Sequence, residues 1–356
     1  VLYNNLTDFE YRYHYLKASM QARLKKFWPF IKVFIWILIT FAVGFQFWKI
    51  LHLEALKDPE GNLNPGTLLL KQLQGVSLSG IILSGILYII GIGFSGWFWA
   101  DLLNDIKQPI SLPFALRCFY IAQLGKYVPG KGLALFLRIN SAMRENVSIS
   151  AGVTTSIYEV LFTMASGAFL AVVLGLLTHE ASSMQISAAI FLMVVTGIPI
   201  LPGLFPFIAE KLGRRFLPAG ESIVVPGSVR SFFRGVISTI ICWFFLGASL
   251  MVLWQAMDTS VNNLSFTQLI WCTGCVTLSN VGGFVASTPG GLGVREKILQ
   301  IMLAESLGHN AVTTAILLRI IWTLSEILTA AGFYWIKPVA NDRKNPEDNN
   351  QPDSNQ

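Results

Sequence analysis

The sequence has few charged residues, and this scarcity limits the class of protein it can be. Only 13% of its 356 residues are Asp, Glu, Lys or Arg, whereas 53% are hydrophobic. Because the charged share is about half that of an ordinary soluble domain, a soluble fold would leave too much apolar surface in water. The composition therefore excludes a soluble globular protein and predicts an integral membrane protein built from hydrophobic helices.

Cysteine is also scarce, and no cofactor or metal is expected. The four cysteines, Cys118, Cys242, Cys272 and Cys275, all lie in apolar surroundings. Cys272 and Cys275 have the C-x-x-C spacing of a redox or metal motif, but inside a membrane segment we interpret them as small packing residues. The sequence also contains no nucleotide P-loop and no nucleophile with a paired base. We therefore expect neither an enzyme nor a nucleic-acid-binding protein.

Long apolar runs occupy most of the chain. Each has roughly 18 or more residues, which is enough for a helix to cross the hydrocarbon core. Residues 1–29 show no cleavable signal, so the first run is predicted to be a membrane anchor. The runs leave no room for a soluble catalytic domain. They are 30–51, 76–100, 150–177, 184–205, 235–256, 264–286 and 311–336.

Lysine and arginine are distributed unevenly between the apolar runs. Segments 1–29, 101–149, 206–234 and 337–356 contain five, six, five and three of them, whereas 52–75 contains two. Segments rich in lysine and arginine face the cytoplasm in most membrane proteins. We therefore predict a basic cytoplasmic N-terminal segment at 1–29 and a polar, disordered cytoplasmic tail at 337–356.

Seven crossings would place the two termini on opposite sides of the membrane, so one apolar segment should not cross. The best candidate is 264–307, where Ser287 to Gly293 interrupt the apolar run and predict a re-entrant hairpin. A similar hairpin is predicted at 110–140, interrupted at Val128 to Gly132. Irregular backbone at membrane depth is tolerated only where it is buried in protein or lines a wet cavity. The two breaks therefore predict a site.

The two halves of the hydrophobic region, 30–177 and 184–336, then share the order span, span, hairpin, span. Because three crossings per half is an odd number, the second half must be inverted relative to the first. The predicted fold is an all-α integral membrane domain at 30–336, with about six full transmembrane helices and two re-entrant hairpins in an inverted repeat. Many secondary transporters are organised in this way. Chance Pro-Gly pairs among 30 glycines are the alternative explanation.

Three ionisable side chains lie well inside apolar spans, namely Glu159, Arg319 and Glu326. Charges at membrane depth are costly and indicate a functional site. Arg319 and Glu326 are seven residues apart and therefore share one helix face. We predict an ion pair between Glu159 and Arg319, which is either structural or part of a transport path.

Cations and glycines gather at both breaks. Exposed backbone amides beside cations favour an anion, so we predict a phosphate site at the first break and a similar anion nest at the second. Contact with anionic lipid headgroups at the cytoplasmic face is the alternative explanation of the first cluster. The residues are Lys126, Pro129, Gly130, Lys131, Gly132 and Arg138 at the first break, and Pro289, Gly290, Gly291, Gly293, Arg295 and Glu296 at the second.

At these motifs the sequence resembles the lysylphosphatidylglycerol synthase transmembrane region family. The resemblance rests on Gly125 to Gly132, Glu159, Pro289 to Glu296 and Arg319, and it covers about residues 30–336. That family is similar to the flippase half of the multiple peptide resistance factor, which moves aminoacylated phosphatidylglycerol between leaflets. The sequence has no soluble aminoacyl transferase domain, so lysine transfer from a charged tRNA is not expected.

The resemblance and the residues together imply a lipid translocase in the bacterial inner membrane. Its expected substrate is an anionic or aminoacylated phospholipid, or a polyprenyl-phosphate-linked lipid, and its expected partners are lipids with anionic headgroups. One alternative is a membrane glycosyltransferase using a lipid-linked sugar, with Glu54, Asp58 and Glu60 in the first outer loop. Another is a non-transporting partner of a lipid-modifying enzyme or glycosyltransferase.

Overall fold

The computed structural model divides the chain into two compact units, Val1–Lys49 and Ile50–Gln356, and almost all described residues belong to the second. The predicted span at 30–51, apart from two residues, the loop at 52–75 and the tail at 337–356 lie outside the described part. The described residues are 41, 45, 76–128, 132–178, 183–201, 203–216, 225–226, 228–257, 265–286, 289–291, 293–307 and 310–335.

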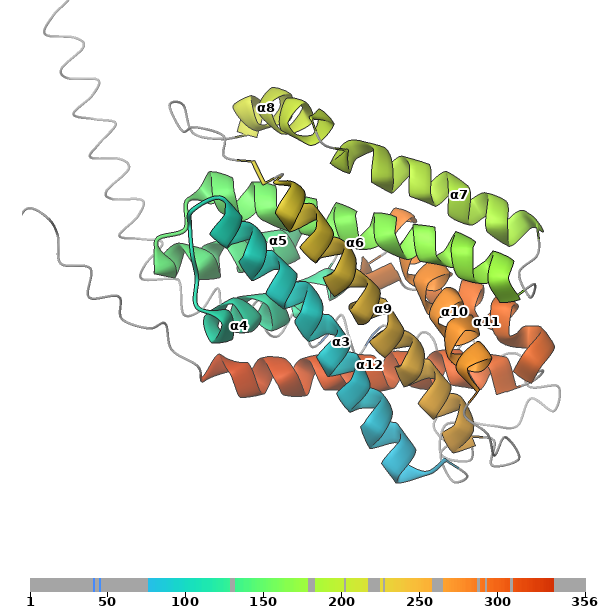
Figure 1. The fold of residues 1–356 in the computed structure, drawn as a ribbon. Helices are drawn as coiled ribbons and strands as arrows, with labels where there is room; N and C mark the ends of the chain where they lie inside the picture. Colours follow the sequence, from blue (N-terminus) through green and yellow to red (C-terminus); the bar gives the residue numbers. More distant parts are fainter. Residues whose placement is uncertain are drawn as a thin grey trace, which may run out of the picture. The chain divides into compact units, whose positions relative to one another are not determined.

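Every regular element among the described residues is a helix, as predicted (Figure 1). Five of them are long and apolar enough to cross a membrane, namely α3, α6, α7 with η3, α9 and α12. The bounds are α3 (Leu78–Asp105), α4 (Leu112–Gln123), η1 (Leu124–Tyr127), α5 (Gly132–Ala142), η2 (Met143–Glu145), α6 (Ile149–Thr178), α7 (Ser183–Gly197), η3 (Ile198–Ile200), α8 (Leu204–Phe216), α9 (Val229–Met257), α10 (Phe266–Val285), η4 (Pro289–Gly291), α11 (Val294–Leu307) and α12 (Asn310–Tyr334).

Each predicted hairpin contains a short 3-10 helix between two longer helices, and below we call these 3-10 helices, η1 and η4, the first and second break. Residues 129–131 of the first predicted interruption lie outside the described part of the chain. In the first hairpin η1 separates α4 from α5, and in the second η4 separates α10 from α11. Proline and glycine explain these interruptions, because proline cannot donate the helical hydrogen bond and glycine adopts backbone angles closed to other residues. Gly290, Gly291 and Gly293 all have positive φ angles, of 60°, 74° and 80°.

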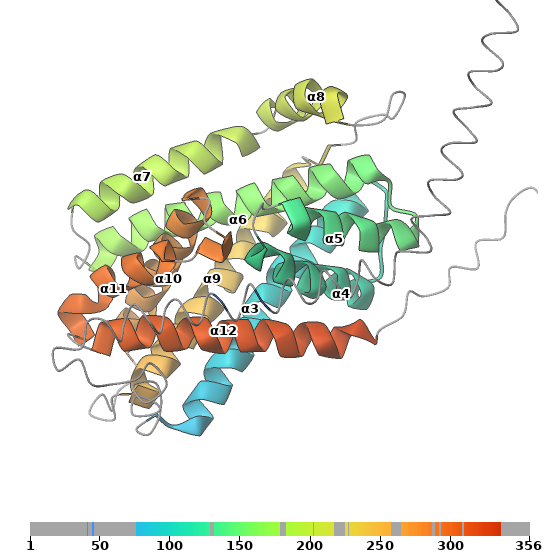
Figure 2. The ribbon, with the colours of Figure 1, turned by 180° about the vertical axis from the view of Figure 1, so that it is seen from behind.

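The two hairpins pack in a reciprocal way against α6 and α12. In the first hairpin α5 contacts α6 and α4 contacts α12, whereas in the second α11 contacts α12 and α10 contacts α6. Figures 1 and 2 show the hairpins on opposite sides of the bundle, and the breaks η1 and η4 contact each other. Two related halves would pack in this way. The inverted repeat and the re-entry from one membrane face stay predictions, because the first span lies outside the described residues.

Small residues bring α3 and α9 together along their length (Figure 1). Gly80 lies so close to Ala256 that a Cβ at Gly80 would overlap the alanine methyl. One helical turn further along, Ser84 Oγ lies 2.9 Å from both the carbonyl and the hydroxyl oxygen of Ser249. Close backbone approach through small residues and buried hydroxyls is typical of helix pairs in membranes.

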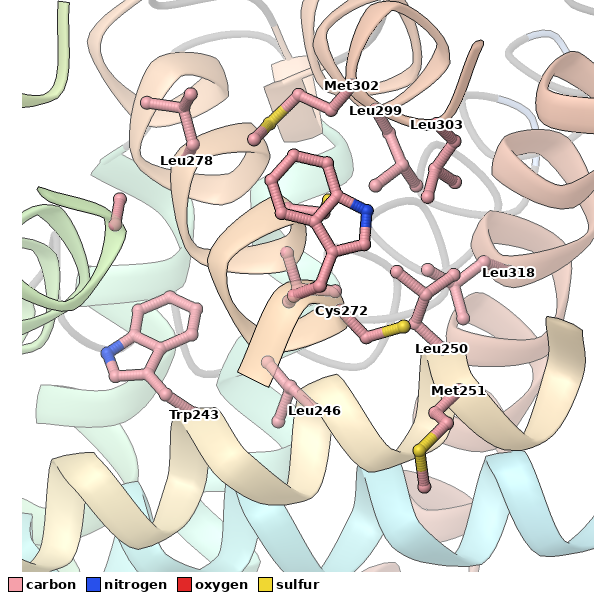
Figure 3. Packing of buried hydrophobic residues seen from close by; sticks show 14 of the residues in the cluster. Trp243, Leu246, Leu250, Met251, Cys272, Leu278, Leu299, Met302, Leu303 and Leu318 are labelled. Atoms are coloured by element: carbon pink, nitrogen blue, oxygen red, sulfur yellow. The ribbon is translucent and has the colours of Figure 1, made fainter. Parts of the chain in front are cut away.

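The main hydrophobic core lies where α9, α10, α11 and α12 meet (Figure 3). Cys272 and Leu303 are fully buried there, and Cys275 belongs to the same cluster. All four cysteines are buried and none of them is in a disulfide. Their interpretation as packing residues therefore agrees with the structure.

The connection predicted at 206–234 contains an element that the sequence analysis did not anticipate. It is the helix α8, in which Phe205 is buried whereas Phe207 and Lys211 are exposed. The search for apolar runs missed α8 because the helix has 13 residues and carries charges. A short amphipathic helix has no long apolar run.

Candidate functional site

A cavity of about 380 Å³ lies between the two hairpins. Its wall includes side chains from α3, α6 and α9 as well as from both hairpins, and most of these side chains are apolar. Ligand pockets of this kind are typically apolar with a few polar groups that fix orientation. The charged or polar residues of the wall are Tyr88, Ser95, Gln123, Lys126, Arg138, Ser156, Glu159, Thr163, Asn280 and Arg295.

Glu159 is paired with Arg138 and not with Arg319, so the predicted ion pair was wrong. The Arg138 Nη1 and the Glu159 Oε2 are 2.8 Å apart, and both residues are buried. The Thr163 hydroxyl donates to the other carboxylate oxygen at 3.2 Å, and the guanidinium of Arg138 lies 4.3 Å from the centre of the Phe119 ring. The physical reason is proximity, because α5 packs directly against α6 whereas Arg319 faces the second break.

Arg319 of α12 holds the second break. Its Nη2 donates to the carbonyl oxygen of Gly290 at 2.6 Å, and its Nε lies 3.6 Å from the Glu296 Oε1. The same guanidinium lies 5.4 Å from the centre of the Tyr127 ring, which belongs to the first break. Glu296 also accepts a hydrogen bond from the Gly293 amide at 2.7 Å. Arg319 therefore joins both breaks to α12.

Glu326, two turns further along α12, binds the first break. Its Oε1 accepts hydrogen bonds from the Tyr88 hydroxyl and from the Lys126 ammonium. Its Oε2 accepts from the Tyr127 hydroxyl at 2.9 Å, and that hydroxyl is also 2.9 Å from the Thr323 Oγ1. A buried carboxylate with one cation and two hydroxyl donors is well satisfied.

Arg295 differs from the other cations of the site. Within the described part of the chain its Nε is buried without a hydrogen-bond partner, and its guanidinium forms no ion pair. Glycines make room for it, since a Cβ at Gly283 or Gly291 would overlap its side chain. The wall of the cavity therefore contains a cation without a counterion.

Among the described residues, the charges beside the cavity do not balance. The cations are Lys126, Arg138, Arg295 and Arg319, and the carboxylates are Glu159, Glu296 and Glu326. Four cations and three carboxylates leave one positive charge in excess, and the pairing assigns it to Arg295. This arrangement suits a bound anion.

The structure brings most of the predicted site residues together. Lys126, Arg138, Glu159, Gly290, Gly291 and Arg295 line the cavity, and Glu296 and Arg319 line a smaller pocket beside it. Glu326 lies behind Lys126. Gly132 and Gly293 do not line the cavity. Pro129, Gly130 and Lys131 lie outside the described residues, and of Pro289 only the backbone is described.

Several polar residues of the site are not among the predicted ones. Tyr88 and Tyr127 bind Glu326, and the hydroxyl of Ser156 lines the cavity without a hydrogen-bond partner. Asn280 is an amide inside an apolar run, and such a residue is a usable signal for an intramembrane site. Tyr88 gave no signal, because its ring fits an apolar run and only its hydroxyl group takes part, whereas Tyr127 lies within the Gly125 to Gly132 motif.

Several long apolar helices around a cavity lined by charged side chains define a multi-pass membrane protein. The family model described as Lysylphosphatidylglycerol synthase TM region matches residues 63–329, and the chain belongs to this family. This match confirms the resemblance seen at the two breaks. A search of curated proteins gave no match to the chain.

Proposed function

We propose that the protein is a translocase for a lipid with an anionic headgroup, and not an enzyme. The proposed substrate is an anionic or aminoacylated phospholipid, or a polyprenyl-phosphate-linked lipid. In this proposal the protein lies in the bacterial inner membrane with both termini in the cytoplasm. Membership of the family supports a lipid-related role in the membrane. The observation that carries the proposal is Arg295, a partly buried cation in a cavity between two helix breaks, which has no ion pair among the described residues.

The chemistry of arginine supports a phosphate as the ligand. Removing a guanidinium from water without a partner is unfavourable, and Arg295 of α11 is partly buried with no ion pair among the described residues. A phosphate or phosphodiester removes this cost, because its oxygens match the planar fork of the guanidinium. A headgroup bound at Arg295 also balances the four cations and three carboxylates beside the cavity.

The size and lining of the cavity support a headgroup and not a whole lipid. A volume of about 380 Å³ accommodates a polar headgroup but not two acyl chains. Ile157 of α6 lines the cavity and is 40% exposed, so the cavity reaches the surface beside an apolar side chain. In the proposed mechanism the headgroup passes Arg295 while the acyl chains stay in the lipid outside α6.

Reconstitution tests the proposal. The purified chain is placed in liposomes with fluorescent phosphatidylglycerol or fluorescent phosphatidylcholine, and an impermeant quencher measures flipping between leaflets. We expect the chain to accelerate flipping of phosphatidylglycerol, and Arg295→Gln to slow it by about tenfold or more, since tenfold corresponds to only about 1.4 kcal/mol. Arg230→Gln, at an exposed position of α9, is the matched control and should flip like the parent.

The experiment also separates the proposal from its rivals. Because the chain is reconstituted alone, a non-transporting partner of a lipid-modifying enzyme would not accelerate flipping. No acceleration over empty vesicles for any anionic lipid tried would refute the translocase. Equal rates for Arg295→Gln and Arg230→Gln would refute the role of Arg295 and leave the translocase to be explained by other residues.

A further inference from the structure

Two side chains, Lys126 and Tyr88, both bind Glu326 and line the cavity. The carboxylate of Glu326 is 1% exposed and does not line the cavity, whereas Lys126, which donates to it, is 21% exposed and does line it. Lys126 therefore has Glu326 on one side and the cavity on the other. An anion in the cavity would compete with Glu326 for the same ammonium group.

Competition of this kind would leave a costly charge behind. Once Lys126 turns to an anion in the cavity, Glu326 keeps only hydroxyl donors, from Tyr88 and Tyr127. Removing the partner of a buried charge typically costs about 3–5 kcal/mol. Uptake of one proton by the carboxylate removes that cost. The entering anion and the proton then cancel, so the net charge of the region does not change.

The hydrogen bonds around Glu326 can accommodate both protonation states. When the carboxylate is charged, the Tyr127 hydroxyl donates to its Oε2. When it is neutral, a proton on Oε2 can donate to Tyr127, and the Tyr127 hydroxyl can rotate to donate to the Thr323 Oγ1, 2.9 Å away. Thr323 in turn donates to the carbonyl oxygen of Arg319 at 2.8 Å. Neither state leaves a hydroxyl hydrogen in this chain without an acceptor.

We propose that Glu326 is a proton-binding site, and that it takes up one proton when an anionic headgroup binds to Lys126 in the cavity. The proposal rests on the proposed function and adds that a proton is the ion coupled to headgroup binding. It implies a direction for the effect of pH. Protonation of Glu326 releases Lys126 for the headgroup, so anion binding strengthens as pH falls, by at most about tenfold per pH unit for one linked proton.

Groups on every element packed against α12 define the surroundings of Glu326. Arg319 lies on the same helix and is paired with Glu296 of α11, and Arg295 of α11 lines the cavity nearby. On α4, Arg117 points away to the carbonyl of Tyr334 at 3.5 Å, and α9 meets α12 through a hydrogen bond between Ser249 and Trp322. The groups that face the carboxylate are Tyr88 of α3 and Lys126 and Tyr127 of η1.

Calorimetry counts the protons directly. Short-chain phosphatidylglycerol is titrated into the purified full chain in detergent, in two buffers with different heats of ionisation. The difference between the two heats gives the number of protons taken up for each lipid bound. We expect uptake approaching one proton in the parent. We expect none in Glu326→Gln, a neutral isostere, whose affinity should change less than about twofold between pH 6 and pH 8.

Two further variants test whether proton uptake depends specifically on Glu326 and on the hydroxyl groups beside it. Asp101→Asn alters another buried carboxylate, which is paired with Arg234 of α9 at 2.5 Å and does not line the cavity. This variant should take up protons like the parent. Thr323→Val removes the acceptor at the end of the hydroxyl chain without changing charge, and should reduce uptake even if Glu326→Gln does not fold. Lipid binding without proton uptake, or unchanged uptake in Glu326→Gln, overturns the inference alone. Absence of lipid binding and of flipping in the parent overturns the proposed function as well.

Discussion

The guanidinium of Arg319 donates a hydrogen bond to the carbonyl oxygen of Gly290, with Nη2 and the oxygen 2.6 Å apart. Seven residues further along the same helix, Glu326 binds Lys126 and Tyr127 of the other hairpin. Seven residues of α-helix rise about 10 Å. α12 is therefore a rigid element that fixes both breaks at a set separation, and a movement of either break must break one of these contacts.

Gly290 should not tolerate a side chain. Its φ angle is 60°, and a Cβ there would lie 2.7 Å from the Arg319 Nη2 and 3.3 Å from the Tyr127 ring. A residue other than glycine in this conformation costs roughly 1–2 kcal/mol before any displacement of Arg319. We therefore expect Gly290→Ala to lower the thermal midpoint in detergent and to slow flipping of phosphatidylglycerol.

Gly332→Ala is the matched control for this substitution. Gly332 lies in α12, and a Cβ there would meet nothing within 4 Å. Because glycine inside a helix is less favourable than alanine by about 0.5–1 kcal/mol, this variant should be as stable as the parent or more stable. A thermal midpoint for Gly290→Ala equal to that of Gly332→Ala would contradict the strained turn at the second break.

Arg138 and Glu159 should show strong energetic coupling. Each alone, replaced by Gln, leaves a buried charge without its partner, for which we expect a loss of about 3–5 kcal/mol in the free energy of unfolding. The double variant Arg138→Gln with Glu159→Gln removes both charges and should be more stable than either single variant. Unfolding in mixed micelles with a double-mutant cycle measures the coupling. Additive losses would show that the 2.8 Å contact contributes little.

Much of the fold could be predicted from sequence because membrane helices leave a strong signal. The spans predicted at 76–100, 150–177 and 311–336 correspond to α3, α6 and α12 within about five residues at each end. Proline and glycine located both breaks, since these residues cannot continue a helix without cost. The amphipathic helix α8 was missed because a short helix with charged residues has no long apolar run.

The charged residues of the site were found, but their pairing was not. Glu159, Arg319 and Glu326 are predicted as ionisable groups in apolar sequence and Arg138 as a cation at the first break, and all four are buried. Which cation meets which carboxylate depends on how the helices pack, and a single sequence contains no information on contacts between helices. For this reason Glu159 was assigned to Arg319, although α5 brings Arg138 to it.

The predicted topology can be tested by cysteine labelling, because the native cysteines are buried and should react slowly. The distribution of lysine and arginine predicts that both termini lie in the cytoplasm and that the end of the second hairpin lies outside. A cysteine at position 309 should therefore react with an impermeant maleimide in intact cells, whereas one at position 345 should react only after lysis. The reverse pattern would remove the inverted repeat as well as the orientation.

The crossing of α9 and α10 should depend on a single glycine. A Cβ at Gly247 would overlap the Oγ1 of Thr273 and lie 2.7 Å from its Cα, so two backbones meet there without room for a methyl group. Thr273 is fully buried and donates to the Leu269 carbonyl at 2.8 Å, which leaves its side chain little freedom to move aside. Overpacking of a buried contact typically costs about 1–3 kcal/mol.

Gly247→Ala should therefore lower the thermal midpoint of the protein in detergent, and Gly274→Ala supplies the comparison. Gly274 lies one residue after Thr273 in α10, but a Cβ there would be 3.6 Å from the Leu174 Cβ, an ordinary van der Waals contact. We expect this second variant to match the parent or to gain up to about 1 kcal/mol, because alanine favours a helix. Equal midpoints for the two variants would mean that α9 and α10 separate easily at this crossing. In that case the close approach at Gly247 would not limit movement of the second hairpin relative to α9.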